Sequence, residues 1–195
     1  MHGLINRAIQ CFVVDSYGSD KWVEAARHAD LGFVEFESML IYDDEVTPKL
    51  LEAVSHVLKR DRNEVMEDIG TYLVSHPNVE ALRRLLRFGG FDFVEFLHSL
   101  DDLPDRARLA VSDLNLPGLE LQDLAPGQFS LVCQSAIAGY GHVMMGVLRA
   151  MADDYGVLAL LEHAGSGDGI ETISVTLIET EFAEGRSFEL GARAL

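Results

Sequence analysis

The apolar side chains of this chain change their spacing near its middle, and this change is what most limits how the chain can fold. In the first 103 residues they recur every three or four positions, which is the spacing of one face of a helix. From residue 119 onward, four segments have the pattern of strands, and one helical segment, Gly141 to Asp154, interrupts them. The strand segments are Leu119 to Leu124, Gln128 to Gln134, Val157 to His163 and Ile170 to Ile178. Helices followed by an antiparallel sheet with one inserted helix indicate the α+β class.

The helical half divides into segments that each place apolar residues on one face. Beyond the apolar run Ile9 to Val14, they are Asp20 to Asp30, Pro48 to Arg60, Arg62 to Val74, Asn78 to Phe88 and Asp92 to Leu103. Thr47 before Pro48 is a typical helix start, and Asp92 with Glu95 has the spacing of a capping box. No repeat or flexible linker divides the chain, so we expect residues 1–195 to form a single domain.

Composition and charge exclude several classes of function. Hydrophobic residues make up 48% of the chain and charged residues 24%, as in ordinary globular proteins. A net charge of −17 opposes binding to nucleic acid and to anionic membranes, and it suits a basic partner surface. The run Ile9 to Val14 is too short to span a membrane. Two cysteines, Cys11 and Cys133, without a secretory signal indicate the cytoplasm.

The sequence contains no motif that indicates an enzyme. Phosphate-binding glycine loops, nucleophile elbows and Cys-x-x-Cys pairs are all missing. Ser135 and His142 suggest a catalytic dyad, but no third group orients them. Acidic runs such as Asp153-Asp154 are more typical of solvated turns than of metal sites. We therefore expect no catalytic activity.

Helical-wheel positions place several histidines on solvated faces. His28, His56 and His142 lie opposite the apolar stripes of their helices. On the segment Asp92 to Leu103, His98 lies nearly opposite the centre of the inward stripe. That stripe consists of Phe93, Phe96, Leu97, Leu100 and Leu103. These histidines are predicted to be exposed rather than to bind a ligand.

Several short motifs resemble those of heme-nitric-oxide/oxygen-binding (H-NOX) domains, a family that includes the β-subunit sensor domain of soluble guanylate cyclase. The motifs are Met1-His2-Gly3-Leu4-Ile5, Asp15-Ser16-Tyr17-Gly18, Glu67-Asp68-Ile69-Gly70, Phe96 to Leu103, and Gly146. The likeness covers nearly the whole chain. It implies an N-terminal helical part packed on a C-terminal antiparallel sheet, with heme between them and nitric oxide as the sensed ligand.

In this family a helix histidine ligates the iron, and a Tyr-x-Ser-x-Arg motif pairs with the heme propionates. Counted from Phe96-Leu97, the histidine position falls on Pro104, which has no donor atom. Continuing the wheel from Phe93 predicts that position 104 faces inward. The strand motif falls on Cys133-Gln134-Ser135-Ala136-Ile137, of which only Ser135 is retained.

The resemblance also assigns the walls of the heme pocket. Pro117 matches the proline that presses on the porphyrin. Ile5, Ile9 and Val143 would form the wall over the open iron face, and all three are apolar. A wall without an O–H donor implies nitric oxide rather than oxygen as the ligand.

Two readings stay open from the sequence. One is a stand-alone heme sensor, with His98 as a substitute metal ligand if its helix is rotated, or with the heme held without a protein ligand or ligated from the other side. The other is a heme-free signalling or interaction module whose pocket is apolar or filled by its own side chains. The nearest basic residues to pair with propionates are Arg83, Arg84 and Arg87, whose spacing better suits an exposed helix face. By resemblance, the partner is a histidine kinase or a cyclic-dinucleotide enzyme.

Overall fold

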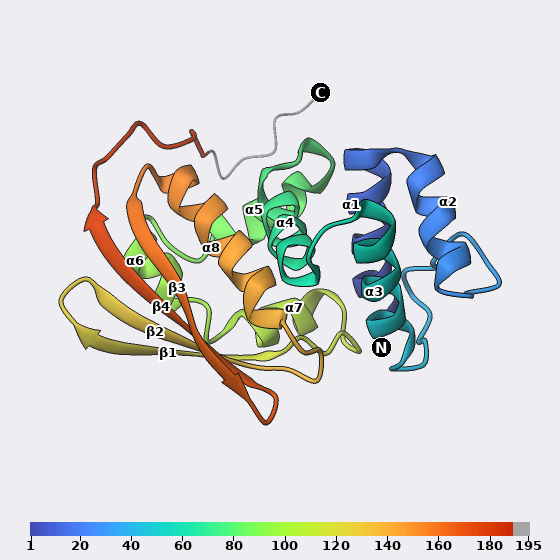
Figure 1. The fold of residues 1–195 in the computed structure, drawn as a ribbon. Coiled ribbons are helices and arrows are strands. Elements are labelled where there is room, and N and C mark those ends of the chain that lie inside the picture. The colour runs from blue at the N-terminus through green and yellow to red at the C-terminus, as the bar shows by residue number, and fades with distance from the viewer. Residues whose placement is uncertain (189–195) are drawn as a thin grey trace.

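The computed structural model describes residues 1–188, in which most helices form one side of the molecule and the sheet forms the other (Figure 1). The helices are α1 (Gly3–Tyr17), α2 (Ser19–His28), α3 (Val46–Leu58), α4 (Arg62–Ser75), a 3-10 turn (Pro77–Val79), α5 (Glu80–Arg87), α6 (Phe93–His98), α7 (Leu103–Ala110) and α8 (Tyr140–Tyr155). The predicted α+β class is confirmed. The predicted single domain includes residues 189–195, which lie outside the described residues.

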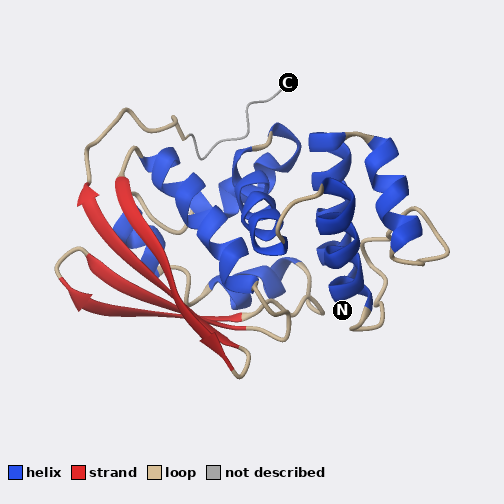
Figure 2. Cartoon of the chain, viewed as in Figure 1, coloured by secondary structure: helices blue, strands red, loops and turns tan. Residues whose placement is uncertain are grey.

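The sheet is antiparallel and has the order β1-β2-β4-β3. Its strands are β1 (Gly118–Ala125), β2 (Gln128–Gln134), β3 (Leu158–Gly167) and β4 (Ile170–Glu179). Alternation along β2 buries Phe129, Leu131 and Cys133 on the face that α8 covers (Figure 2). One of the two hydrophobic cores of the described residues lies between this face and α8, as the prediction of an inserted helix on the sheet requires.

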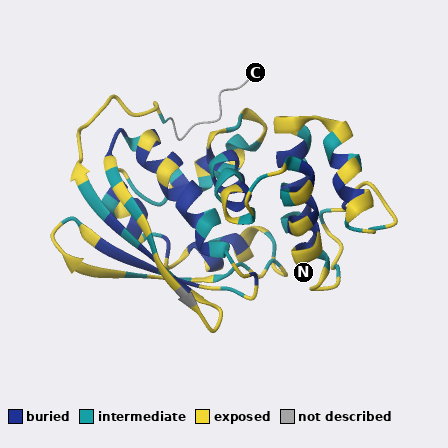
Figure 3. Ribbon diagram, viewed as in Figure 1, coloured by how far each residue is buried: buried dark blue, intermediate teal, exposed yellow. Residues whose placement is uncertain are grey.

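A second core lies among α1, α2, α3 and α4. Val13, Trp22, Leu50 and Val54 are buried in it, and Figure 3 shows the buried residues of these helices on the faces they turn toward one another. The core residues recur at helical spacing, which is why the sequence pattern finds these elements. Within residues 1–188, no helix combines the length and hydropathy needed to cross a membrane.

The two parts of the molecule join where α4 crosses α8. A Cβ atom at Gly70 would overlap the carbonyl oxygen of Val143, and one at Gly146 would overlap that of Glu67. Only glycine allows the two backbones to approach so closely. An ion pair between Glu67 and Arg149 links the same two helices.

The segment predicted as one helix from Asp92 to Leu103 contains α6, a turn over residues 99–102 and the first residue of α7, so this prediction is wrong at its C-terminal end. Helix α6 ends at His98, and α7 begins at Leu103 with Pro104 in its first turn. Proline lacks an N–H group and clashes with the preceding turn, so it starts a helix rather than continuing one. Continuing the wheel from α6 to position 104 is therefore not valid.

Candidate functional site

A large apolar cavity of about 1110 Å³ lies between the helical part and the nearer end of the sheet. This volume is at the upper end of the range for small-molecule sites. Walls come from α1, α3, α4, α5, α7, the end of β2 and the start of α8. Aliphatic side chains dominate the surface, among them Leu4, Leu51, Ile69, Leu82, Leu85 and Val147.

Most of the wall residues assigned by resemblance do line this cavity. Ile5 and Ile9 reach it from α1, and Val143 reaches it from α8. Pro117 lies immediately before β1, and Ser135 lies immediately after β2. The Ser135 Oγ accepts a hydrogen bond from the Ile137 N–H at 3.0 Å, so this hydroxyl holds the turn that leads into α8.

Pro104 and Cys133 do not line the cavity. Pro104 is buried at the start of α7, while Leu103 and Ala107 of the same helix form the wall there. Cys133 is buried in the core between the sheet and α8, where burial raises the pKa of its thiol to about 12. Neither residue presents a donor atom to the cavity.

His98 lies outside the cavity as well. Its side chain is 49% exposed, and its Nε2 is 3.5 Å from Asp123 Oδ1 on β1. The ring also meets the edge of Phe129, with the two centroids 6.0 Å apart. Its position on the outer face of α6 agrees with the helical wheel and leaves it remote from any ligand in the cavity.

His2 is a buried polar residue of the cavity that the sequence patterns did not identify. It is only 4% exposed, and its Nδ1 accepts the N–H of Leu4 at 3.2 Å as the N-cap of α1. A neutral ring in this position therefore carries its proton on Nε2. That atom is buried without a hydrogen-bond partner, 3.5 Å from Asp113 Oδ1. The only sequence signal that could have identified His2 is its position before the first helix, where a side chain can cap that helix. A helical wheel gives no information at a chain end.

Tyr140, the first residue of α8, also lines the cavity and was missed. Burial raises the pKa of its phenol, so the group stays a neutral O–H donor. Tyr140 thus adds an O–H group to the cavity lining beyond the apolar wall expected from Ile5, Ile9 and Val143. Tyr140 follows a turn instead of lying within a periodic segment, so the apolar pattern does not place it.

Two carboxylates, Asp44 and Asp113, line the cavity. Asp44 Oδ1 accepts a hydrogen bond from the amino group of Met1 at 2.7 Å. Asp113 is 54% exposed and stays in contact with solvent. Among residues 1–188, no lysine or arginine side chain lines the cavity.

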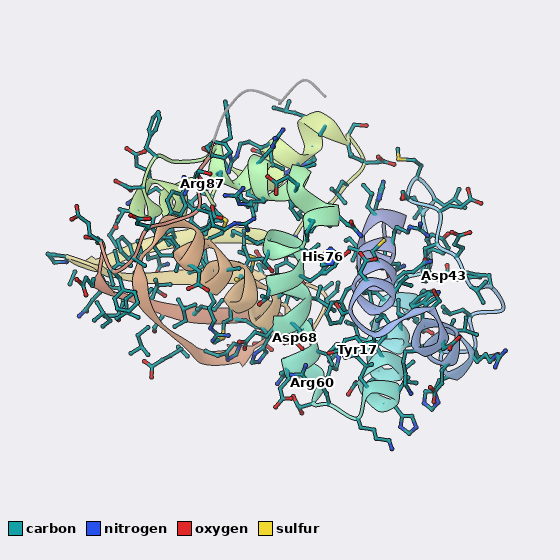
Figure 4. All side chains as sticks on the ribbon, turned by 90° about the horizontal axis from the view of Figure 1, so that it is seen from above. Tyr17, Asp43, Arg60, Asp68, His76 and Arg87 are labelled. Atoms are coloured by element: carbon teal, nitrogen blue, oxygen red, sulfur yellow. The ribbon has the colours of Figure 1, made fainter. Side chains whose placement is uncertain are left out.

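The arginines of α5 lie on a different face from the cavity. Arg83 Nε donates to Asp154 Oδ1 at 2.7 Å, and Arg87 Nε is 3.5 Å from Oδ2 of the same residue. Arg87 stacks its guanidinium on the Tyr155 ring, 3.8 Å from the centroid, and Figure 4 labels it on the sheet side of the molecule. Arg84 points to Glu80. The exposed helix face predicted for this cluster is thus partly wrong, because Arg83 is buried and Arg87 is partly buried against α8.

Fold and cavity together define a class of protein: an α+β domain with a large apolar cavity where its helical and sheet parts meet. The comparisons with known proteins give the family. The family model described as haem-NO-binding matches residues 2–162, and the chain belongs to this family. The resemblance found in the sequence is therefore confirmed.

Individual relatives are distant in sequence. Soluble guanylate cyclase 89Da of Drosophila melanogaster is 22% identical over 155 residues, which is 80% of this chain and 23% of that protein. The chain thus spans about a quarter of the length of this curated relative. Among solved structures, a Cs H-NOX mutant has a TM-score of 0.76 at 17% identity, covering 94% of this chain and all (100%) of that one. An H-NOX protein from S. oneidensis, described in an Fe(II)NO ligation state, has a TM-score of 0.72 at 20% identity, covering 91% and 99%.

The residues of the cavity do not fit a heme held as the family name implies. His2 is the only histidine among the described lining residues, and its Nε2 carries a proton instead of a free electron pair. Tyr140 would ligate iron as a phenolate, which its raised pKa opposes. The thioethers of Met66 and Met144 remain, but methionine serves heme iron as the companion of a histidine. The two propionates would meet no lysine or arginine in the lining, the Met1 amino group there is already paired with Asp44, and Asp113 would repel them.

Proposed function

We propose that this chain is a sensor domain whose signal is the filling of the cavity, and that it does not anchor heme through a helix histidine. The observation that carries the proposal is a ligand-sized apolar cavity in an H-NOX fold whose position 104 is a proline outside the cavity wall. The match to the family model described as haem-NO-binding supports sensing over an enzymatic role.

The arrangement of the cavity suggests how filling it would be transmitted. A ligand would touch α1 and α4 on one side and α7 and α8 on the other. Helices α4 and α8 touch backbone to backbone at Gly70 and Gly146, so a shift of one is passed directly to the other. Shifts of packed helices by an ångström or two are an established output of sensor domains.

The partner we propose is a signalling enzyme, a histidine kinase or a cyclic-dinucleotide enzyme, as the family resemblance implies. A net charge of −17 favours a basic docking surface on that partner. We infer a cytoplasmic location because Cys11 and Cys133 are both free thiols, which a reducing compartment maintains. We also infer that residues 1–195 act as one domain.

Heme-based nitric oxide sensing is the alternative function, and a visible spectrum separates it from the proposal. The protein is expressed with heme supplementation and purified. We expect no sharp Soret band. A strong band that shifts with nitric oxide would overturn the heme-free proposal, and its loss in His98→Ala would then identify His98 as the ligand.

Binding of Nile red, a neutral fluorescent dye, tests whether the cavity receives ligands. We expect dye fluorescence with the wild-type protein, and its loss in Ala107→Phe, which fills the cavity from α7. Leu109→Phe is the matched control, because Leu109 lies on the same helix and is 89% exposed. Leu85→Trp fills the cavity from α5, should the first variant fail to fold. If the dye binds all variants equally, the cavity is not the ligand site.

A further inference from the structure

We infer that the ligand of this cavity is an uncharged, mainly apolar small molecule with a hydrogen-bond acceptor such as a carbonyl, which the Nε2–H of His2 receives. This inference rests on the proposed function and specifies the chemical class of the ligand. The proposed class consists of molecules without a carboxylate. A tetrapyrrole with two propionates therefore lies outside it.

The residues that line the cavity determine the polarity of the main part of the ligand. Aliphatic side chains from α1, α3, α4 and α5 cover most of the surface, so an apolar body gains the usual hydrophobic free energy on entering. A carboxylate would lose its hydration without meeting a lysine or arginine in the described lining. The Met1 amino group there is already paired with Asp44, and Asp113 would repel the carboxylate. The charge pattern thus selects against anions.

A cationic ligand is also disfavoured. Asp44 is already paired with the amino group of Met1. Asp113 keeps about half of its side chain in solvent, where an ion pair gains little. The remaining lining is aliphatic and would desolvate an ammonium group without offering it further acceptors.

His2 supplies the specific contact. The N-cap bond from Leu4 fixes Nδ1 as an acceptor, so Nε2–H is the free donor. Its distance of 3.5 Å to Asp113 is too long for a strong hydrogen bond, and the atom has no other partner. A buried donor without a partner is costly, so a ligand acceptor placed there relieves that cost. An acceptor on the ligand is therefore recognised at the α1 end of the cavity.

Tyr140 provides a second neutral donor on the α8 side of the cavity. Its phenol lines the cavity, and burial raises the pKa of this group, so the O–H keeps its proton. A ligand with two acceptors would be held at both walls, one belonging to the helical part and one to the part that carries the sheet.

Displacement of Nile red by three molecules with one ring system tests the inference. Acetylnaphthalene carries a carbonyl, naphthalene carries no acceptor, and naphthoate carries a negative charge. We expect acetylnaphthalene to displace the dye at roughly 10-fold lower concentration than naphthoate, and at lower concentration than naphthalene. Displacement by naphthoate at equal or lower concentration overturns the inference.

Variants at His2 separate recognition from folding. His2→Asn keeps a side-chain acceptor for the N–H of Leu4 and removes Nε2–H. We expect it to weaken acetylnaphthalene binding about 5-fold and to leave naphthalene binding unchanged. Equal weakening of both would show a structural role for His2 and would overturn its assignment. His98→Asn is the control histidine outside the cavity.

These experiments also distinguish a failure of this inference from a failure of the proposed function on which it rests. If Nile red does not bind at all, the proposed ligand site fails and the inference fails with it. If the dye binds but naphthoate is preferred, only the assigned ligand class fails. Should His2→Asn not fold, His2→Ser replaces it, because serine also caps a helix, and its expected signature is selective loss of acetylnaphthalene binding.

Discussion

At the scale of single residues, Glu171 on β4 holds the start of α8 in place. Its carboxylate accepts the N–H groups of Gly139 at 2.7 Å and Gly141 at 3.2 Å, and it lies 2.9 Å from His163 Nε2. The His142 ring stacks on His163 with centroids 4.6 Å apart. This cluster positions Tyr140 and the first turn of α8, which form one wall of the cavity.

His142 makes the stability of this cluster depend on pH. Burial, followed by the neighbouring His163, lowers the pKa of His142 from its usual value of 6.5, and the carboxylates of Glu171 and Asp61 oppose this only in part. The unfolded chain therefore binds a proton at His142 before the folded chain does, and stability falls as the pH drops below 6.5 toward the folded pKa.

We expect His142→Gln to lose less stability than the wild type between about pH 7.5 and pH 5.5. The measurement is the free energy of unfolding in urea at both values, and the difference between the two proteins should be constant above pH 7.5. An identical decrease in the two proteins would contradict the assigned role of His142.

At the scale of elements, the crossing of α4 and α8 depends on two glycines. Gly146→Ala would force the α8 backbone away from Glu67, and we expect a loss of about 1–3 kcal/mol in the free energy of unfolding. Gly167→Ala on β3 is the control, because a Cβ there meets no atom within 4 Å. If both variants unfold at the same urea concentration, the close crossing does not need a glycine.

The elements themselves follow from the sequence wherever burial is periodic. Helices α2 to α5, α8 and all four strands lie within a few residues of their predicted positions, because one face of each is packed in a core. The first helix was predicted only as the run Ile9 to Val14, and α1 extends from Gly3 to Tyr17. The break between α6 and α7 was missed because a wheel assumes continuity. Pro104 lies in the first turn of a new helix, and it should have been interpreted as a helix start in the same way as Pro48 near the start of α3.

The cavity follows from the sequence only in part. Ile5, Ile9 and Val143 were placed by resemblance and do line it. His2 caps α1 and Tyr140 begins α8, where periodicity carries no signal. His2 lies within the family motif Met1 to Ile5, but the resemblance assigned it no role. Ligand-binding groups at the starts of helices can therefore be identified only from the three-dimensional structure.

At the scale of the whole molecule, the cavity is where the two cores come closest without filling the space between them. The helical core ends at residues such as Ile9 and Ile69, and the sheet core ends at residues such as Leu86 and Met144, all of which face the cavity or border it. A ligand there adds contacts to both cores at once. Binding should therefore stabilise the molecule as a single unit.

This linkage gives a quantitative prediction. A ligand at 100 times its dissociation constant adds about 2.7 kcal/mol to the free energy of unfolding, which for a domain of this size corresponds to an increase in Tm of roughly 5–10 °C. We expect acetylnaphthalene to raise the Tm of the wild type by this amount in a single cooperative transition, and not to raise that of Ala107→Phe. Two separate transitions, with only one of them moving, would mean that the ligand touches one core alone and that the cavity does not couple the two parts.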